Sequence, residues 1–289
     1  MVKIAKQEYK TYGNCIAFIA GDIKLLVTID LGPRIIFYGK GDKNIMFEDL
    51  QDTTSKGGEF FDKNLSGLGI WHLYGGHRLW KSPEYMDTYY PDNAKVEYEI
   101  LNDNSVIFTS NVERTTGLQK IIKVQMQDNG DVELTQEIKN IEGKIKTPIS
   151  AWGLTVLDKG TKATIPLSTE DTGFLPNRNV VFWSYTDIKD ERINIENDKI
   201  VIQQKNIVNP IKIGLYTTKK IEADVNGMHF TVEMDKKEGV YPDYSCNVEC
   251  YTNNHIFEIE TLSPLTGLAP KESLVHKEYW TLRWGENYE

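Results

Sequence analysis

Apolar and polar residues alternate along much of the chain, which is the pattern of half-buried β-strands. In residues 120–127, positions 122, 124 and 126 are apolar, and the positions between them are Lys or Gln. A second alternating run follows at 131–138. The two runs are separated by Asp128-Asn129-Gly130, a sequence typical of hairpin turns. We therefore predict a β-hairpin here.

Similar patterns predict strands over most of the chain, and no amphipathic helix of ten or more residues interrupts them. The further predicted strands are 14–20, 23–30, 33–38, 95–100, 105–111, 148–156, 199–204, 211–216, 228–234, 245–251, 255–262 and 274–284. No linker rich in Pro, Ser or Gly divides the chain. The expected fold is all-β, a large antiparallel sandwich formed by one domain over 1–289.

Composition narrows the range of partners. The 289 residues include 33 Lys and Arg against 42 Asp and Glu, a formal charge of -9. That balance argues against a nucleic-acid surface and against docking to anionic lipid. No apolar run reaches the ~20 residues of a membrane span, and the N-terminus lacks the apolar core of a signal peptide. With only three cysteines, a reducing cytoplasmic location is expected.

The segment 55–92 breaks the alternation and is rich in Gly, Trp, Tyr, His and Asp, which is typical of a functional loop. Within it, a Gly-Gly pair precedes the imidazole of His77, the guanidinium of Arg78, the indole of Trp80 and the carboxylate of Glu84. Indoles can cover the apolar face of a sugar ring while charged groups hold its hydroxyls. The alternative is a loop pinned by a buried Arg–Glu pair, with the indole filling the core.

Two acidic side chains form a second candidate site. Glu258 and Glu260 share one face of the predicted strand 255–262, at a separation of ~7 Å given by two residues of strand rise. Neighbouring carboxylates repel, which raises the pKa of at least one and suits it to acid or base catalysis near neutral pH. A solvated strand face is the alternative interpretation.

The remaining candidates are an aspartate in a turn and several His and Cys residues. Asp243 lies in a predicted turn, where it either holds a sugar hydroxyl or a cation or only shapes the turn. We expect no metal site, because His72 and His77 have no clear third partner and Cys246 and Cys250 fit small core residues. There is no phosphate loop, dinucleotide fingerprint or nucleophile elbow, and no cofactor is expected.

Several stretches together resemble a known family. They are Gly32-Pro33-Arg34-Ile35, Asn44-Ile45-Met46-Phe47, Gly75-Gly76-His77-Arg78-Leu79-Trp80 with Pro83-Glu84, Tyr241-Pro242-Asp243, Glu258-Ile259-Glu260-Thr261-Leu262-Ser263-Pro264-Leu265 and Trp280-Thr281-Leu282. The chain is similar to the galactose mutarotase-like superfamily of aldose 1-epimerase-like proteins, and most closely to a bacterial branch, the DUF4380 group. The resemblance spans essentially the whole chain. It implies a large antiparallel β-supersandwich with a carbohydrate site on its concave face.

The resemblance also implies roles for residues. Aldose 1-epimerases use a glutamate near the C-terminus as general base and a histidine as general acid, and the family Glu-Thr pair matches Glu260-Thr261. His77 and Arg78 match an early histidine and arginine, although their spacing differs. The mid-chain strand that carries the acid histidine in the family has Trp152 instead. Either His77 takes the acid role, or the protein does not mutarotate.

The predicted function is therefore that of a carbohydrate-active protein, an aldose 1-epimerase-like isomerase if it is an enzyme at all. The catalytic candidates are Glu260 and His77, and the substrate-binding candidates are Arg78, Arg34, Trp80, Glu84, Asp243, Trp152 and Glu258. A non-catalytic carbohydrate-binding protein is the first alternative. The second is an oligosaccharide hydrolase or lyase, since a carboxylate spacing of ~7 Å falls in the range of inverting glycosidases. The expected partner is a small sugar or sugar derivative.

Overall fold

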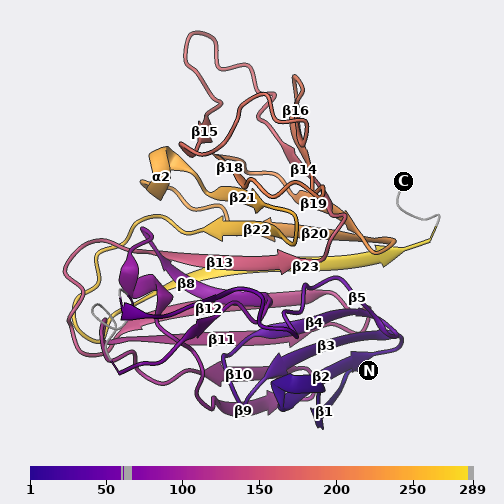
Figure 1. The fold of residues 1–289 in the computed structure, drawn as a ribbon, viewed down its shortest axis with the longest axis vertical. Coiled ribbons are helices and arrows are strands. Elements are labelled where there is room, and N and C mark those ends of the chain that lie inside the picture. The colour runs from indigo at the N-terminus through magenta and orange to yellow at the C-terminus, as the bar shows by residue number, and fades with distance from the viewer. Residues whose placement is uncertain (60, 62–66, 286–289) are drawn as a thin grey trace.

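The computed structural model describes residues 1–59, 61 and 67–285. Its strands form two large antiparallel sheets and one separate two-stranded ribbon (Figure 1). The architecture is an all-β sandwich, as the alternation predicts. Whether all 289 residues form one domain stays a prediction.

The first sheet contains the strands that later form the site. In spatial order it runs β1 (Lys3–Glu8), β2 (Asn14–Ala20), β3 (Ile23–Thr28), β4 (Ile35–Lys40), β8 (Gly76–Ser82), β13 (Ser150–Leu157), β22 (Phe257–Leu262), β21 (Val248–Thr252), β18 (Ile211–Leu215) and β15 (Val180–Phe182), with β5 (Lys43–Asn44) paired to β4. Strands far apart in the chain, such as β8 and β22, thus lie on either side of β13.

The second sheet closes the other side of the core. Its order is β16 (Ile193–Ile195), β17 (Lys199–Gln203), β14 (Lys162–Pro166), β19 (Ile221–Val225), β20 (Met228–Met234), β23 (Ser273–Trp284), β12 (Val132–Asn140), β11 (Leu118–Met126), β10 (Ser105–Thr109) and β9 (Glu97–Asn102). Apolar side chains of the two sheets interleave between them. For example, Tyr38 of the first sheet contacts Phe230 and Trp280 of the second, with ring centroids 6.2 and 5.9 Å apart.

The predicted hairpin is confirmed. β11 and β12 pair antiparallel, with Leu118 opposite Asn140 and Met126 opposite Val132. The chain turns at Gly130, whose φ of 86° is one that glycine adopts without strain.

The prediction for 95–100 is wrong in one respect. The alternation there puts Val96, Tyr98 and Ile100 on one side of a half-buried strand, but the side chains of Tyr98 and Ile100 are 41% and 53% exposed. They belong to β9, which is the edge strand of the second sheet and is exposed along its whole length. Alternation marks which residues share a face, but it does not tell whether a second layer covers that face.

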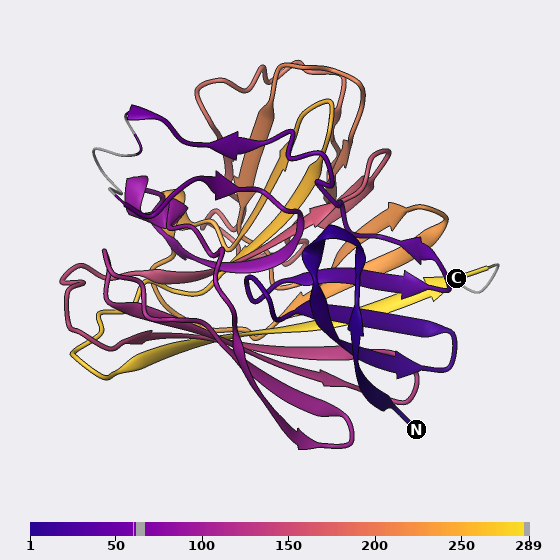
Figure 2. The ribbon, with the colours of Figure 1, turned by 60° about the horizontal axis from the view of Figure 1, so that its bottom comes forward.

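The prediction of an irregular loop over 55–92 is wrong for residues 76–82, which form β8 within the first sheet. The rest of the described part of that segment lies outside the sandwich. It contributes the ribbon of β6 (Ser55–Lys56) and β7 (Trp71–His72), and the short 3-10 turn η2 (Met86–Tyr89). Figure 2 shows this ribbon outside the two sheets, on the same side as η2. Two further short elements are η1 (Lys10–Tyr12) and α2 (Pro242–Ser245). Within the described ranges, the structure contains no helix that is long and apolar enough for a membrane span.

Candidate functional site

A cavity of about 230 Å³ lies on the face of the first sheet that points away from the second sheet. Its floor consists of side chains from β8, β13, β22, β21 and β18. Its walls come from β6, β7, the segment 84–89 and the turn between β21 and β22. The charged and polar side chains of the floor are Arg78, Glu258, Glu260, Tyr251 and Lys212.

The register of the sheet explains why these side chains meet. Arg78 pairs with Leu154, Leu154 pairs with Glu260, and Glu260 pairs with Glu249. Paired residues of neighbouring strands point to the same face, so these four form one row across the sheet. The next row runs through Val156, Glu258, Tyr251 and Lys212. Residues from four distant parts of the chain are thereby brought onto one surface.

The faces predicted for the strand at 255–262 are those observed in β22. Phe257 and Ile259 belong to the apolar core between the sheets. Glu258 and Glu260 point to the opposite face and line the cavity. The alternative of a solvated strand face is wrong, because Glu258 is only 9% exposed and Glu260 only 1%. Two buried carboxyl groups are thus held side by side on the cavity floor.

Glu260 is surrounded by donors. Its Oε2 accepts hydrogen bonds from Trp152 Nε1 at 2.9 Å and from Lys212 Nζ at 2.7 Å. Lys212 Nζ also forms an ion pair with Glu249 Oε2 at 2.7 Å, so one ammonium bridges two buried carboxylates. Burial lowers the pKa of Lys212, but the two carboxylates outweigh it and hold that pKa well above its ordinary value. The ammonium therefore keeps its charge beside Glu260.

Glu258 has a different environment. The nearest cation is Arg78, whose Nη2 lies 3.8 Å from Glu258 Oε1, beyond normal hydrogen-bond length. Burial raises the pKa of Glu258 to about 7, against the lowering effect of Arg78 and with a smaller raising effect of Glu260. Two adjacent carboxyl groups are thus differentiated, since one is paired with an ammonium and an indole and the other is not.

Arg78 has unused hydrogen-bonding capacity. Its side chain is 3% exposed. Among the described residues, its Nε and Nη1 have no hydrogen-bond partner. The guanidinium instead stacks on Trp80, with Cζ 4.1 Å from the ring centroid. Burial, followed by the nearby Arg34, lowers its pKa to about 10. Unpaired donors of a buried guanidinium are costly, and a ligand with acceptor oxygens would satisfy them.

Aromatic rings form one wall of the cavity. Trp80 contacts Trp71 and Trp152, with ring centroids 5.7 and 5.5 Å apart, and Tyr89 packs against Trp80 at 5.1 Å. Trp80 is 6% exposed, so it fills a small apolar core as well as lining the cavity. Glu84 lines the cavity and accepts a hydrogen bond from the Tyr89 hydroxyl.

The expectation that His77 shares a pocket with Glu260 is wrong. His77 is fully buried between the two sheets. Its Nδ1 lies 2.9 Å from Thr155 Oγ1 and its Nε2 lies 3.0 Å from Gln136 Oε1. Burial also lowers its pKa. The physical reason is strand alternation, because His77 and Arg78 are consecutive in β8 and point to opposite faces.

Two substrate-binding candidates also lie outside the cavity lining. Arg34 is fully buried and holds loops together, donating from Nη1 to the carbonyl of Leu73 at 2.9 Å and pairing through Nη2 with Asp92 at 2.9 Å. Asp243 is in α2, where its φ of 49° and that of Tyr244, 59°, are left-handed. This segment is a tight turn, which agrees with the turn-forming alternative.

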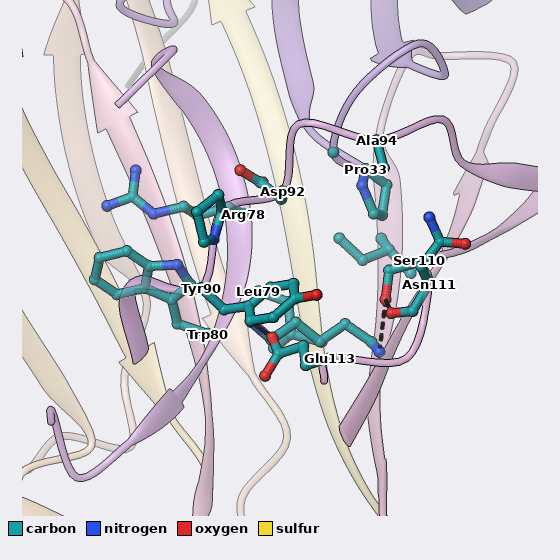
Figure 3. A pocket seen from close by; sticks show the side chains of 14 residues that line it. Pro33, Arg78, Leu79, Trp80, Tyr90, Asp92, Ala94, Ser110, Asn111 and Glu113 are labelled. Carbon is teal, nitrogen blue, oxygen red and sulfur yellow. Dashed lines mark hydrogen bonds and ion pairs between the residues drawn. The ribbon is translucent and has the colours of Figure 1, made fainter. Parts of the chain in front are cut away.

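A second cavity, of about 100 Å³, shares the β8 wall (Figure 3). Figure 3 shows Ser110 and Asn111 on the opposite side of it from Arg78 and Trp80, with Glu113 between them at the bottom of the view. The acidic group here is already paired, because Glu113 accepts from Thr116 Oγ1 at 2.5 Å and pairs with Lys120 at 2.6 Å. The larger cavity is therefore the stronger candidate site.

Several lining residues were missed by the sequence interpretation. Lys212 and Tyr251 sit on alternating strands, and their place opposite a core face was readable. Their nearness to Glu258 and Glu260 was not, because it depends on which strands pair. His255 lies in the turn between β21 and β22, is exposed, and lines the cavity rim. Within the described ranges, no group of three or more His, Cys, Asp or Glu residues is placed to hold a metal ion.

Comparison with known proteins gives structural matches only. No protein-family description and no curated protein sequence matches the chain. Among solved structures, a galactose mutarotase-like protein from Clostridium acetobutylicum is 13% identical, with a TM-score of 0.56 over 98% of this chain and 99% of that one. A candidate aldose 1-epimerase from Escherichia coli K12 is 12% identical, with a TM-score of 0.55 over 99% and 100%. One from Klebsiella pneumoniae is 11% identical, with a TM-score of 0.57 over 96% and 83%.

The chain has the galactose mutarotase-like fold. This confirms the fold that the sequence motifs imply. The narrower DUF4380 branch stays a prediction.

Proposed function

We propose that the protein binds a monosaccharide in the cavity over β22 and interconverts its anomers, as an aldose 1-epimerase-like isomerase with Glu260 as general base. The observation that carries the proposal is the buried carboxylate of Glu260, held by Lys212 and Trp152 in a cavity walled by aromatic rings. Both hydrogen bonds from described residues end on Oε2, which leaves Oε1 for a substrate hydroxyl.

The dimensions and lining of the cavity support a monosaccharide as its ligand. Its volume of about 230 Å³ is just below the range of ~300–1,000 Å³ typical of drug-sized ligands. Trp80 and Trp152 offer apolar faces, while Arg78 and Glu84 offer groups that bind hydroxyls. The fold shared with the mutarotase-like proteins supports the same conclusion.

The test is a direct measurement of anomer interconversion by NMR exchange spectroscopy. The substrates are a panel of aldohexoses, aldopentoses, uronic acids and hexose 6-phosphates, compared with the uncatalysed rate. The wild type is expected to accelerate exchange for at least one sugar, and Glu260→Gln is expected to lose at least ~100-fold of that acceleration. Equal rates in the two proteins would remove Glu260 from the mechanism.

A binding protein without catalysis is the second candidate, and the position of His77 favours it, because none of the described residues places a buried imidazole beside Glu260. In that case a sugar raises the melting temperature of the protein without accelerating anomer exchange. Release of reducing ends from a polysaccharide panel would instead favour the hydrolase or lyase alternative.

A further inference from the structure

We propose that Glu258 is the second proton-transfer group of this site and delivers a proton to the ring oxygen of the sugar, the role that His77 cannot fill. The inference rests on the proposed mutarotase function. It replaces the acid–base pair of an imidazole and a carboxylate by two carboxyl groups on one strand.

Position is the first argument. Glu258 and Glu260 are two residues apart on the same face of β22 and both line the cavity, so that their backbones are separated by ~7 Å. That distance spans the anomeric hydroxyl and the ring oxygen of one pyranose, which are attached to the same carbon, when each carboxyl group reaches about one hydrogen-bond length inward. Among the described residues, the Glu258 carboxyl group has no hydrogen bond, only the 3.8 Å contact with Arg78. It is therefore available to a ligand.

Environment is the second argument. Proton transfer in both directions needs one group that is ionised and one that holds a proton near neutral pH. Glu260 accepts from an ammonium and an indole, while Glu258 is buried with a pKa of about 7. The charged and titratable groups around Glu258 are Arg78, Glu260, Lys212, Glu84, Tyr251, Tyr89, Lys56, Tyr185 and His255.

The proposed step balances without any further reactant. Glu260 removes the proton of the anomeric hydroxyl, and the C1–O1 bond becomes a carbonyl as the bond from C1 to the ring oxygen breaks. The electron pair of the broken bond goes to the ring oxygen, which takes the proton of Glu258. After rotation about C1–C2 the steps reverse, and each carboxyl group regains its starting state.

His255 is the competing candidate. It lines the same cavity, but it is exposed in the turn between β21 and β22, where Nε2 contacts the side chain of Asn254 at 3.1 Å. A solvated side chain on a turn is held less firmly than one on a buried strand. We therefore assign the role to Glu258 and use His255 as a test.

The experiment compares the wild type with Glu258→Gln and His255→Gln, with Glu222→Gln as a matched control on an exposed position of β19. Anomer exchange is measured from pH 5.5 to 9 with the sugar that the wild type accelerates most, and folding is checked by circular dichroism. In Glu258→Gln, kcat is expected to fall at least ~100-fold with KM changed only a few-fold. Glu222→Gln is expected to keep the wild-type rate.

The pH profile provides a readout that a merely structural role would not change. Because Glu258 must be protonated, the wild-type rate is expected to decline as pH rises above about 7, and the residual rate of Glu258→Gln is expected to lack that decline.

An active wild type whose Glu258→Gln variant keeps its rate within ~3-fold overturns this assignment alone, as does a loss of activity confined to His255→Gln. A wild-type rate that does not change between pH 6 and 8.5 also overturns it. A wild type inactive on every sugar of the panel overturns the proposed function together with this inference.

Discussion

Replacing Glu258 by Gln is expected to stabilise the protein at alkaline pH and to leave its stability almost unchanged near pH 4.5. The carboxyl group is 9% exposed, and Arg78, the described cation with which it forms an ion-pair contact, lies 3.8 Å away. Burial therefore outweighs the cation and raises the pKa of Glu258 from 4.5 to about 7. An ionised carboxylate here costs free energy that an amide of similar shape avoids.

The size of the effect follows from the two pKa values. The folded protein binds this proton more tightly than the unfolded chain does, so the free energy of unfolding is highest below pH 4.5. It falls as pH rises from 4.5 to about 7 and stays lower above that range. The difference between these two pKa values corresponds to about 3 kcal/mol of unfolding free energy. For a chain of this length, that is roughly 6 °C in Tm.

The free energy of unfolding is measured by urea denaturation at pH 5, 6, 7 and 8. The proteins compared are the wild type, Glu258→Gln and the exposed-site control Glu222→Gln. Titrating groups that do not interact with Glu258 cancel in the difference between variant and wild type. The gain of Glu258→Gln is expected to be small at pH 5 and about 3 kcal/mol at pH 8, while the control shows no trend. A difference that stays constant over this range, or a variant less stable than the wild type at pH 8, would refute the reasoning.

Two other substitutions probe the buried polar groups. Lys212→Met removes the ammonium that pairs with Glu249, so urea unfolding at pH 8 is expected to show a loss of about 3–5 kcal/mol, and a smaller loss at pH 5, where protonation relieves the unpaired carboxylates. An equal loss at both pH values would contradict this. Gly153→Ala would place a methyl group 2.2 Å from Glu278 Oε1, so a loss of about 1–3 kcal/mol is expected. Gly267→Ala is its control, because a methyl group there meets no atom within 4 Å. Equal stability of these two variants would contradict the steric argument.

The sequence correctly predicts the sandwich, the hairpin at 128–130 and the two faces of β22, because strand alternation is a local property. It did not reach Lys212, which lies 48 residues before its partner Glu260. Nor did it anticipate that Tyr89 would wall the site beside the predicted Glu84. Both depend on pairing between strands distant in the chain, and no local pattern specifies that pairing. The prediction of a half-buried strand at β9 is wrong for the same reason. Whether another layer covers a strand also depends on distant parts of the chain.

Within those limits, alternation could still have excluded one assignment. His77 and Arg78 are adjacent in a strand, so they point to opposite faces, and at most one of them can share a pocket with Glu260. The same rule applies to Thr261, which follows Glu260. Its hydroxyl donates to Glu278 Oε1 at 2.6 Å and lies 2.8 Å from His276 Nε2, in the polar cluster between the sheets. A matching Glu-Thr pair therefore places its two residues in separate environments, and the family resemblance of a motif does not put all of its side chains in one site.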